Sequence, residues 1–233
     1  MTNRLEDYFY GNKGRAIYKW TSYFESYEKH FSQFVDRPVT ILEFGVMHGG
    51  SLQMWKNYFG ERARIIGVDI NPRCKELEED QIEIFIGDQA DRKFLHKMKE
   101  AIGPIDVIID DGGHIMKQQI TTFQEMWPAL KNGGVYVVED THTSYYPMFG
   151  GKLGKKNTFI SLSKRLIDQM NAWFVDATAE PRLKIDEYTE SVKAIHFYTS
   201  IVVFDKAEVT KPQADIRGQL TDVEFNYPGT YRR

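Results

Sequence analysis

Ile105-Asp106-Val107-Ile108-Ile109-Asp110-Asp111-Gly112-Gly113-His114 is the stretch of sequence that decides the fold. A second stretch, Gly134-Val135-Tyr136-Val137-Val138-Glu139-Asp140-Thr141-His142, repeats the same order of an apolar run followed by acids. Short runs rich in Ile and Val are typical of buried strands. Ligands bind at the carboxyl ends of strands in an open α/β sheet, so both runs bring their acids to the binding edge.

Three carboxylates, those of Asp111, Glu139 and Asp140, would share one crevice if the two strands are neighbours. Close carboxylates repel one another unless a cation lies between them or some of them take up protons. The sequence therefore predicts a divalent metal site, with His114 three residues from one of its ligands. Asp110 is expected to contact the backbone or a cofactor. The competing interpretation is that these acids cap the helix or loop after each strand.

Strand-like and helix-like segments alternate along the middle of the chain. Strands are expected at 39–44, 63–70, 82–86, 105–109 and 135–138. Helices are expected at 52–58, 73–79, 91–101, 117–130 (closed by Gly133) and 157–170. Two later runs, 194–198 and 200–204, indicate an antiparallel pair. This order predicts an α/β fold with a Rossmann-like seven-stranded, mostly parallel sheet, an antiparallel C-terminal strand and helices on both faces.

The two ends of the chain differ from this middle part. Apolar residues spaced three and four apart predict an amphipathic helix over about 15–34. Residues 1–36 are therefore assigned to an N-terminal helical cap, 37–206 to a catalytic domain and 207–233 to a polar tail packed on it. An exposed aromatic face on the helix would also favour a homo-oligomer.

The composition excludes several classes of protein. The chain has 233 residues, of which 42% are hydrophobic and 27% charged, and its formal net charge is -3. This balance favours neither nucleic acid nor a membrane surface as a partner. No run approaches the ~20 apolar residues that span a bilayer, and the polar first 20 residues do not resemble a signal peptide. With Cys74 as its one cysteine, the protein is expected to be cytoplasmic.

A glycine-rich turn follows the first expected strand and contains Gly45, Gly49 and Ser51. Glycine lets the backbone approach a ligand closely, and the following helix offers free N–H groups to an anionic part of that ligand. The dinucleotide fingerprint has glycine at the middle position, where this chain has Met47, so the pyrophosphate of NAD fits poorly. Glu43, two residues before the first glycine, suits a ligand that carries an ammonium group.

Polar residues also close the next two strands. Asp69 would accept hydrogen bonds from the hydroxyls of a ribose, and Asp88 with Gln89 would lie within reach of an adenine. S-adenosylmethionine has a ribose, an adenine, an ammonium and a carboxylate, and it needs no pyrophosphate cradle. These features together favour S-adenosylmethionine as the cofactor. The alternative is a glycine-rich turn without any cofactor, as in many α/β proteins.

The order of these motifs resembles that of the class I S-adenosylmethionine-dependent methyltransferases. It is more closely similar to the metal-dependent sugar O-methyltransferases of macrolide biosynthesis, of the mycinamicin and macrocin type. The resemblance covers about residues 39–205 and rests on Glu43–Ser51, Asp110–His114, Val138–Tyr145 and Ile195–Phe204. It implies transfer of a methyl group to a hydroxyl of a sugar or glycoside. It also implies Mg²⁺ held by Asp111, Glu139 and Asp140, with His114 as the base.

In such a mechanism Mg²⁺ would chelate two vicinal hydroxyls of the acceptor and lower the pKa of the attacking one. Asp111 would then serve catalysis as a metal ligand, and His114 would take the proton. Two alternatives stay open: His142 as the base, and His114 as a cap for the helix near Lys117. A loop at 141–156 is expected to lie over the crevice, where His142, Tyr145 and Tyr146 would contact the acceptor.

Two other functions compete with methyl transfer. The cephalosporin hydroxylase-like proteins share the acidic pattern, which makes a metal-dependent oxidation the second hypothesis. A non-haem iron oxygenase usually uses two histidines and one carboxylate, whereas the oxygen donors here favour Mg²⁺. The third hypothesis is a non-catalytic binding protein on the same fold.

Overall fold

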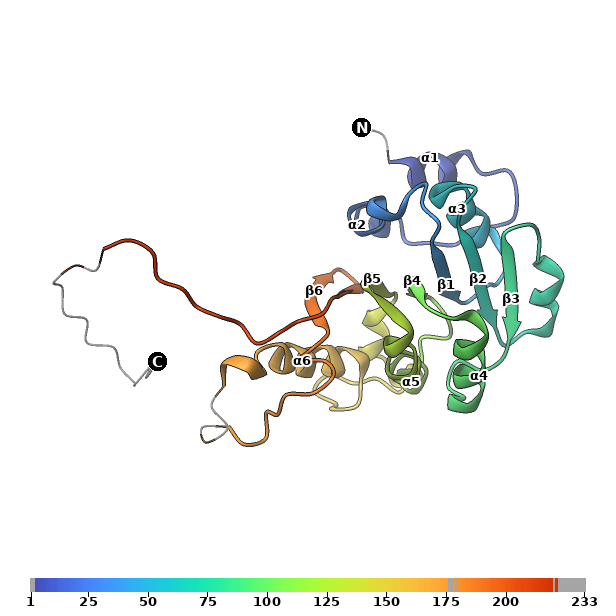
Figure 1. Cartoon of the computed structure of the whole chain (residues 1–233). Helices are drawn as coiled ribbons and strands as arrows, with labels where there is room; N and C mark the ends of the chain where they lie inside the picture. Colours follow the sequence, from blue (N-terminus) through green and yellow to red (C-terminus); the bar gives the residue numbers. More distant parts are fainter. Residues whose placement is uncertain (1–2, 176–177, 179, 220, 222–233) are drawn as a thin grey trace.

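Strand side chains alternate between two hydrophobic cores, one on each face of a seven-stranded sheet (Figure 1). The computed structural model describes residues 3–175, 178, 180–219 and 221. The strands are β1 (Thr40–Phe44), β2 (Arg64–Asp69), β3 (Ile82–Ile86), β4 (Ile105–Asp110), β5 (Leu130–Val138), β6 (Val192–Tyr198) and β7 (Ile201–Lys206). The α-helices are α1 (Arg4–Gly11), α2 (Phe24–Phe31), α3 (Gly50–Phe59), α4 (Arg92–Ile102), α5 (Met116–Met126) and α6 (Phe159–Met170).

The strand order puts the binding edge near the middle of the sheet. The order is β3-β2-β1-β4-β5-β7-β6, and β1 to β5 run parallel. β7 pairs antiparallel with both β5 and β6. The chain moves outward from β1 to β3 and then returns to the other side of β1 as β4. The carboxyl ends of β1 and β4 therefore form the switch point where such sheets bind ligands. The fold class predicted from the sequence is confirmed.

Aromatic side chains fill the core between the sheet and helices α1, α2 and α3. Tyr27 and Phe31 of α2 lie 5.2 and 5.7 Å from Trp55 of α3, measured between ring centroids, and all three rings are buried. Helices α4, α5 and α6 cover the opposite face, where Phe123 packs against Phe204 of β7 (Figure 1). Because each buried aromatic side chain contributes roughly 1.5–3 kcal/mol, α2 is firmly attached to the sheet.

The helix expected over 15–34 is present only in part. A 3-10 helix at Thr21–Tyr23 leads into α2, and another follows at Ser32–Phe34. Residues 12–20 form no helix. Tyr18 and Trp20 are 77% and 52% exposed, while Lys19 between them is buried. Alternating exposure of successive side chains is typical of an extended backbone. The spacing of the aromatic residues had instead indicated a helix.

Two further boundaries differ from expectation. The helix predicted to continue to residue 130 ends at Met126, because Pro128 cannot continue it. Gly133 consequently lies within β5 and does not close a helix. The helix expected at 73–79 is a 3-10 helix, Pro72–Leu77.

The loop and the tail also differ from the expectations. The segment 141–156 begins with two 3-10 helices, Thr141–Tyr145 and Pro147–Phe149, and its Thr143 and Ser144 are buried. The tail starts on the sheet, where the backbone N–H groups of Ala207 and Val209 donate to the carbonyl oxygens of Ser191 and Glu190. Residues 210–219 are exposed and lead away from the sheet (Figure 1). Residues 220 and 222–233 of the tail lie outside the described residues. No helix in the described ranges has the length and apolar character needed to cross a bilayer.

Gly50, the first residue of α3, lets the N-terminal segment pack closely on the sheet. A Cβ atom there would lie 2.3 Å from the carbonyl oxygen of Ala16 and 2.4 Å from that of Arg15. We expect Gly50→Ala to lower the free energy of unfolding by about 1–3 kcal/mol through this overpacking. Urea denaturation would measure it. Gly11→Ala is the control, because nothing lies within 4 Å of its Cβ position; equal effects in both variants would contradict the prediction.

Candidate active site

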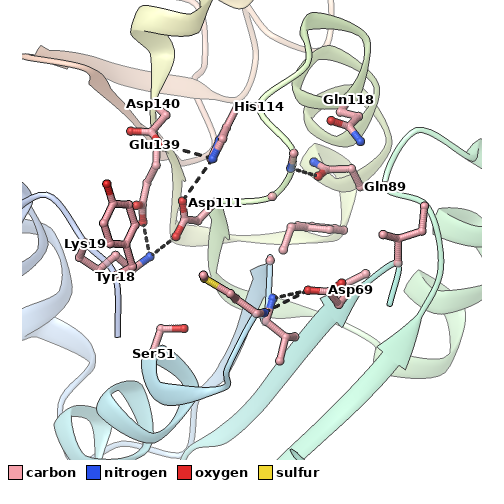
Figure 2. Close-up of a pocket in the computed structure, with 18 of the residues that line it drawn as sticks. Tyr18, Lys19, Ser51, Asp69, Gln89, Asp111, His114, Gln118, Glu139 and Asp140 are labelled. Atoms are coloured by element: carbon pink, nitrogen blue, oxygen red, sulfur yellow. Dashed lines mark hydrogen bonds and ion pairs between the residues drawn. The ribbon is translucent and has the colours of Figure 1, made fainter. Parts of the chain in front are cut away.

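A cavity of about 450 Å³ opens at the carboxyl ends of the strands, between the glycine-rich turn after β1 and the segment after β4. Nine of the residues predicted to form the site line it: Gly45, Ser51, Asp69, Asp88, Gln89, Asp111, His114, Glu139 and Asp140. Figure 2 shows the acids and His114 on one side of this cavity and Asp69 on the other. The structure therefore brings these nine residues together around one cavity.

The turn after β1 approaches the end of β4 so closely that it requires glycine. Gly45 has φ +95, and a Cβ atom there would lie 2.1 Å from the carbonyl oxygen of Asp111. Gly49, with φ +75, is the N-cap of α3, although it does not line the cavity. The Asp69 carboxylate fixes the turn by accepting hydrogen bonds from the backbone N–H groups of Val46 and Met47, at 2.9 and 3.1 Å. The turn is thus held in shape by the protein itself.

Asp110 does not reach the cavity, which corrects its assignment as a cofactor contact. Successive side chains of a strand point to opposite faces, so Asp110 and Asp111 diverge. The Asp110 carboxylate is fully buried and accepts a 2.9 Å hydrogen bond from Gln89. Burial raises the pKa of Asp110 to about 6. The Gln89 amide also accepts a hydrogen bond from the backbone of Gly113, so both residues shape the wall of the site.

A buried lysine that the sequence did not reveal lies among the acids. The Lys19 Nζ donates hydrogen bonds to Glu43 Oε1 at 3.0 Å, Asp111 Oδ2 at 2.6 Å and Glu139 Oε1 at 2.9 Å. Its side chain is only 1% exposed. Glu43 also accepts a hydrogen bond from Ser51 and does not line the cavity, so it holds Lys19 rather than a ligand.

The charges of this cluster depend on one another. Burial opposes the charged form of Lys19, but Asp111 and Glu139 outweigh burial and hold the pKa of the ammonium well above its ordinary value. Burial, and then the charge of Asp111, raise the pKa of Glu139. Burial likewise raises the pKa of Glu43. The carboxylates are costly as anions here, so further positive charge would stabilise them.

The two adjacent acids after β5 point in different directions. The Tyr27 hydroxyl of α2 donates a 2.6 Å hydrogen bond to Glu139 Oε1. Asp140 adopts a left-handed conformation with φ 52, and its Oδ1 accepts a 2.7 Å hydrogen bond from the Tyr23 hydroxyl. The unusual backbone angle turns Asp140 back toward the cavity, where it meets His114. Tyrosines of the N-terminal cap therefore orient both acids.

One oxygen of each carboxylate remains free of these anchors. Lys19 and the two tyrosines occupy Asp111 Oδ2, Glu139 Oε1 and Asp140 Oδ1. Among the described residues, Glu139 Oε2 has no hydrogen-bond donor. Asp111 Oδ1 and Asp140 Oδ2 face only His114 Nε2, at 3.9 and 3.3 Å (Figure 2). Asp111 and Asp140 gather with His114, and Asp111 also gathers with Glu139 and Glu43; in each trio the ligand atoms lie within 4.8 Å of one another. Oxygen donors of this kind suit a hard divalent cation.

His114 is held in a strained conformation at the edge of the acids. Its φ is 54, in the left-handed region that side chains other than glycine rarely adopt. Its Nδ1 is buried without a hydrogen-bond partner among the described residues. The helix α5 starts at Met116 with Ile115 as its N-cap residue, so His114 does not cap it. A strained residue with an unpaired polar atom beside two carboxylates, those of Asp111 and Asp140, is a candidate for function.

Trp20 lines the cavity, and further aromatic side chains lie near it. Trp20 lies 6.4 Å from His142, and His142 lies 5.8 Å from Tyr146, measured between ring centroids. Trp20, Tyr145 and Tyr146 are each about half exposed. His142 donates to or accepts from the Ser200 hydroxyl and does not reach the cavity. Of the residues predicted to contact an acceptor, His142 lies beside Trp20 and Tyr146 beside His142, but none of His142, Tyr145 and Tyr146 lines the cavity.

Comparisons with known proteins agree with this geometry. Residues 42–141 match the family described as "Methyltransferase domain". The 8-demethyl-8-alpha-L-rhamnosyl tetracenomycin-C 2'-O-methyltransferase of Streptomyces olivaceus is 38% identical over 199 residues, covering 81% of this chain and 51% of that protein. The Mycinamicin VI 2''-O-methyltransferase of Micromonospora griseorubida is 33% identical over 190 residues, covering 77% of this chain and 47% of that protein. The MycE methyltransferase in complex with Mg and SAH superposes with a TM-score of 0.78 at 30% identity, covering 88% of this chain and 54% of that one.

The chain therefore has a Rossmann-like fold, and its residues 42–141 match a methyltransferase domain. More specifically, it is similar to sugar O-methyltransferases of macrolide and tetracenomycin pathways, which confirms the resemblance found in its motifs. The chain spans about half the length of the curated relatives it matches.

The hydrogen bond from Tyr27 to Glu139 gives a direct test of how the cap supports the site. Because Tyr27→Phe leaves a buried carboxylate with one donor fewer, we expect the free energy of unfolding to fall by about 1–2 kcal/mol in EDTA. Thermal and urea denaturation would measure the loss. Tyr10→Phe is the matched control, since that ring is 69% exposed. A loss no larger than in the control would show that the hydrogen bond is not needed.

Proposed function

We propose that this protein transfers a methyl group from S-adenosylmethionine to a hydroxyl of a sugar or glycoside, assisted by Mg²⁺ and by His114. The observation that carries the proposal is that one cavity joins a glycine-rich turn to the carboxylates of Asp111, Glu139 and Asp140, with His114 in a strained backbone conformation beside Asp111 and Asp140. The names of the relatives support it, because one acts on a rhamnosyl group and another binds Mg and SAH.

The cavity fits the cofactor in volume and in polarity. About 450 Å³ is available, within the usual range of small-molecule sites. Asp69 and Asp88 line it at the ends of β2 and β3, where acceptors for the hydroxyls of a ribose are needed. Gly45 and Gly112 also line the cavity, where the absence of a side chain lets the walls pack closely against Asp111 and Gln89. Asp110 and Glu43 take no part in cofactor contact in this proposal.

The acidic donors fit Mg²⁺, which prefers oxygen ligands. Asp111, Glu139 and Asp140 would hold the ion through the oxygens that Lys19, Tyr23 and Tyr27 leave free. When bound, the ion supplies a Lewis acid that orients two neighbouring hydroxyls of the acceptor and lowers the pKa of one of them. Orientation of this kind contributes up to ~7–11 kcal/mol in favourable reactions.

His114 is proposed as the base. In the reaction the hydroxyl oxygen forms a bond to the methyl carbon, the carbon–sulfur bond breaks to give S-adenosylhomocysteine, and His114 takes the proton of the hydroxyl. Its Nε2 lies 3.3 Å from Asp140 Oδ2, where a carboxylate stabilises the imidazolium that forms. His142 is the less favoured base, because its ring lies outside the cavity and pairs with Ser200.

The exposed aromatic side chains beside and after Asp140 are proposed as the acceptor side of the site. Trp20, Tyr145 and Tyr146 offer exposed ring faces, which suit the apolar face of a sugar or the body of a glycosylated natural product. The acceptor itself, a homo-oligomeric assembly and a cytoplasmic location stay predictions. So does the assignment of 1–36 as a cap and 37–206 as the catalytic domain.

The competing oxidation fits the donors less well. The cluster of Asp111, Asp140 and His114 offers one histidine and two carboxylates. A non-haem iron oxygenase usually needs two histidines and one carboxylate. A methylated product without oxygen incorporation would separate the two reactions.

Cofactor binding is tested first, by calorimetric titration with S-adenosylhomocysteine in Mg²⁺ and again in EDTA. We expect similar affinity in both buffers, because the turn and the acidic cluster lie on different sides of the cavity. Asp69→Ala should weaken binding by about 10–100-fold, since it loses charged hydrogen bonds to the turn and the ligand. Asp168→Ala, on the far helix α6, is the control. If the unaltered protein does not bind S-adenosylhomocysteine in either buffer, the methyltransferase proposal is wrong.

The base is tested by comparing two histidine substitutions. We expect His114→Ala to reduce methyl transfer to a rhamnosyl glycoside by about 10²–10⁴-fold while leaving S-adenosylhomocysteine affinity unchanged. His96→Ala, on the surface of α4, should leave the rate unchanged, and EDTA should abolish it in all variants. Product would be followed by mass spectrometry. Full activity of His114→Ala, or a larger loss in His142→Ala, would remove His114 from the role of base.

A further inference from the structure

We propose that Lys19 is a built-in counter-cation of the acidic cluster, which shares its carboxylates with the bound divalent ion and weakens the binding of that ion. The inference rests on the proposed function for the identity of the ion. It concerns a residue of the N-terminal segment, outside the motifs that indicated the metal site.

The contacts of Lys19 assign it this role. It bonds three carboxylates that belong to different strands, since Glu43 lies on β1, Asp111 follows β4 and Glu139 follows β5. Among the described residues, no other lysine or arginine lies within 4.0 Å of these three acids. Without Lys19 the cluster would keep its negative charges buried and uncompensated, which is strongly destabilising.

Lys19 is also fixed in place. Its ammonium lies 6.0 Å from the ring centroid of Tyr27 and 5.8 Å from that of Trp55, both of which are buried. The backbone just before it packs against Gly50, with no space for a Cβ atom. The lysine therefore stays in the cluster when an ion arrives, and the two cations must share the acids.

The distribution of oxygens allows this sharing. Lys19 uses Asp111 Oδ2 and Glu139 Oε1, and leaves the second oxygen of each carboxylate free. Two cations on opposite oxygens of one carboxylate compete for its charge and repel each other. For a single and a double positive charge held by the same carboxylate, this repulsion raises the dissociation constant of the divalent ion about tenfold, even with the dielectric screening of water.

Two properties of the protein follow. The metal-free protein keeps a preassembled site, because the lysine already balances part of its charge. The ion binds reversibly and adds little to the stability of the fold, since it relieves only the charge that Lys19 leaves over. With a neutral side chain of similar length in place of the lysine, the metal-free site should lose its charge balance, and the ion should bind more tightly and add more to the stability of the fold.

The experiment compares Lys19→Met with Lys19→Arg, which keeps the charge, and with Lys131→Met as a surface control. Melting temperatures are measured in EDTA and in Mg²⁺, and Mg²⁺ affinity by calorimetry. We expect Lys19→Met to melt about 5 °C or more below the unaltered protein in EDTA. It should recover most of this loss in Mg²⁺ and bind Mg²⁺ about tenfold more tightly. Lys19→Arg and Lys131→Met should stay close to the unaltered protein.

Equal or weaker Mg²⁺ binding by Lys19→Met would overturn the inference, as would an unchanged melting temperature in EDTA. If Lys19→Met is unfolded in EDTA, refolding by Mg²⁺ supports the inference and failure to refold overturns it. These readouts need neither S-adenosylmethionine nor an acceptor. A failed S-adenosylhomocysteine titration beside the expected Lys19→Met results would therefore overturn the methyltransferase proposal alone.

Discussion

Balancing buried negative charge is the constraint on which the rest of this structure depends. Parallel strands end at one edge of a sheet, so acids at the ends of β1, β4 and β5 are forced together whatever their roles. The ammonium of Lys19 at the centre of the cluster balances part of this charge, and the hydroxyls of Tyr23 and Tyr27 donate hydrogen bonds to the acids. Because these donors sit on a cap that is packed by aromatic residues, the hydrophobic core under α2 and the charge balance of the site are parts of one arrangement.

Adjacent acids take different roles because of the geometry of the strand. Asp110 faces the core and Asp111 the cavity, as the two-residue period requires. Glu139 and Asp140 would diverge in the same way, but the left-handed backbone of Asp140 returns it to the cavity. His114 has the same kind of backbone angle. Among the described residues, six that are not glycine have positive φ, and two of them are the residues that bring the acids and the histidine together. Backbone strain of this kind is often maintained at functional sites.

The periodic parts of the fold were predictable and the aperiodic parts were not. Short apolar runs such as Ile105–Ile109 are stable mainly as buried strands. The sheet, and the places of Asp111, Glu139 and Asp140 after its strands, therefore followed from the sequence. In the extended segment 12–20 burial alternates but hydropathy does not, since Lys19 is buried between the exposed Tyr18 and Trp20. The spacing of the aromatic residues there therefore resembled that of a helix. Lys19 consequently gave no signal beyond the general need of close carboxylates for a cation. Asp110 was misplaced for a different reason, since neighbouring acids look alike until the strand's register is known.

The N-terminal segment joins the two halves of the site. In extended chain, neighbouring side chains point in opposite directions, so Lys19 enters the acidic cluster while Trp20 faces outward beside His142. A shift of this segment by one residue would exchange them, exposing the charge and burying the indole. The charge balance of the acids therefore fixes the position of an aromatic side chain at the mouth. The surface offered to an acceptor depends on the same electrostatics that would hold the metal.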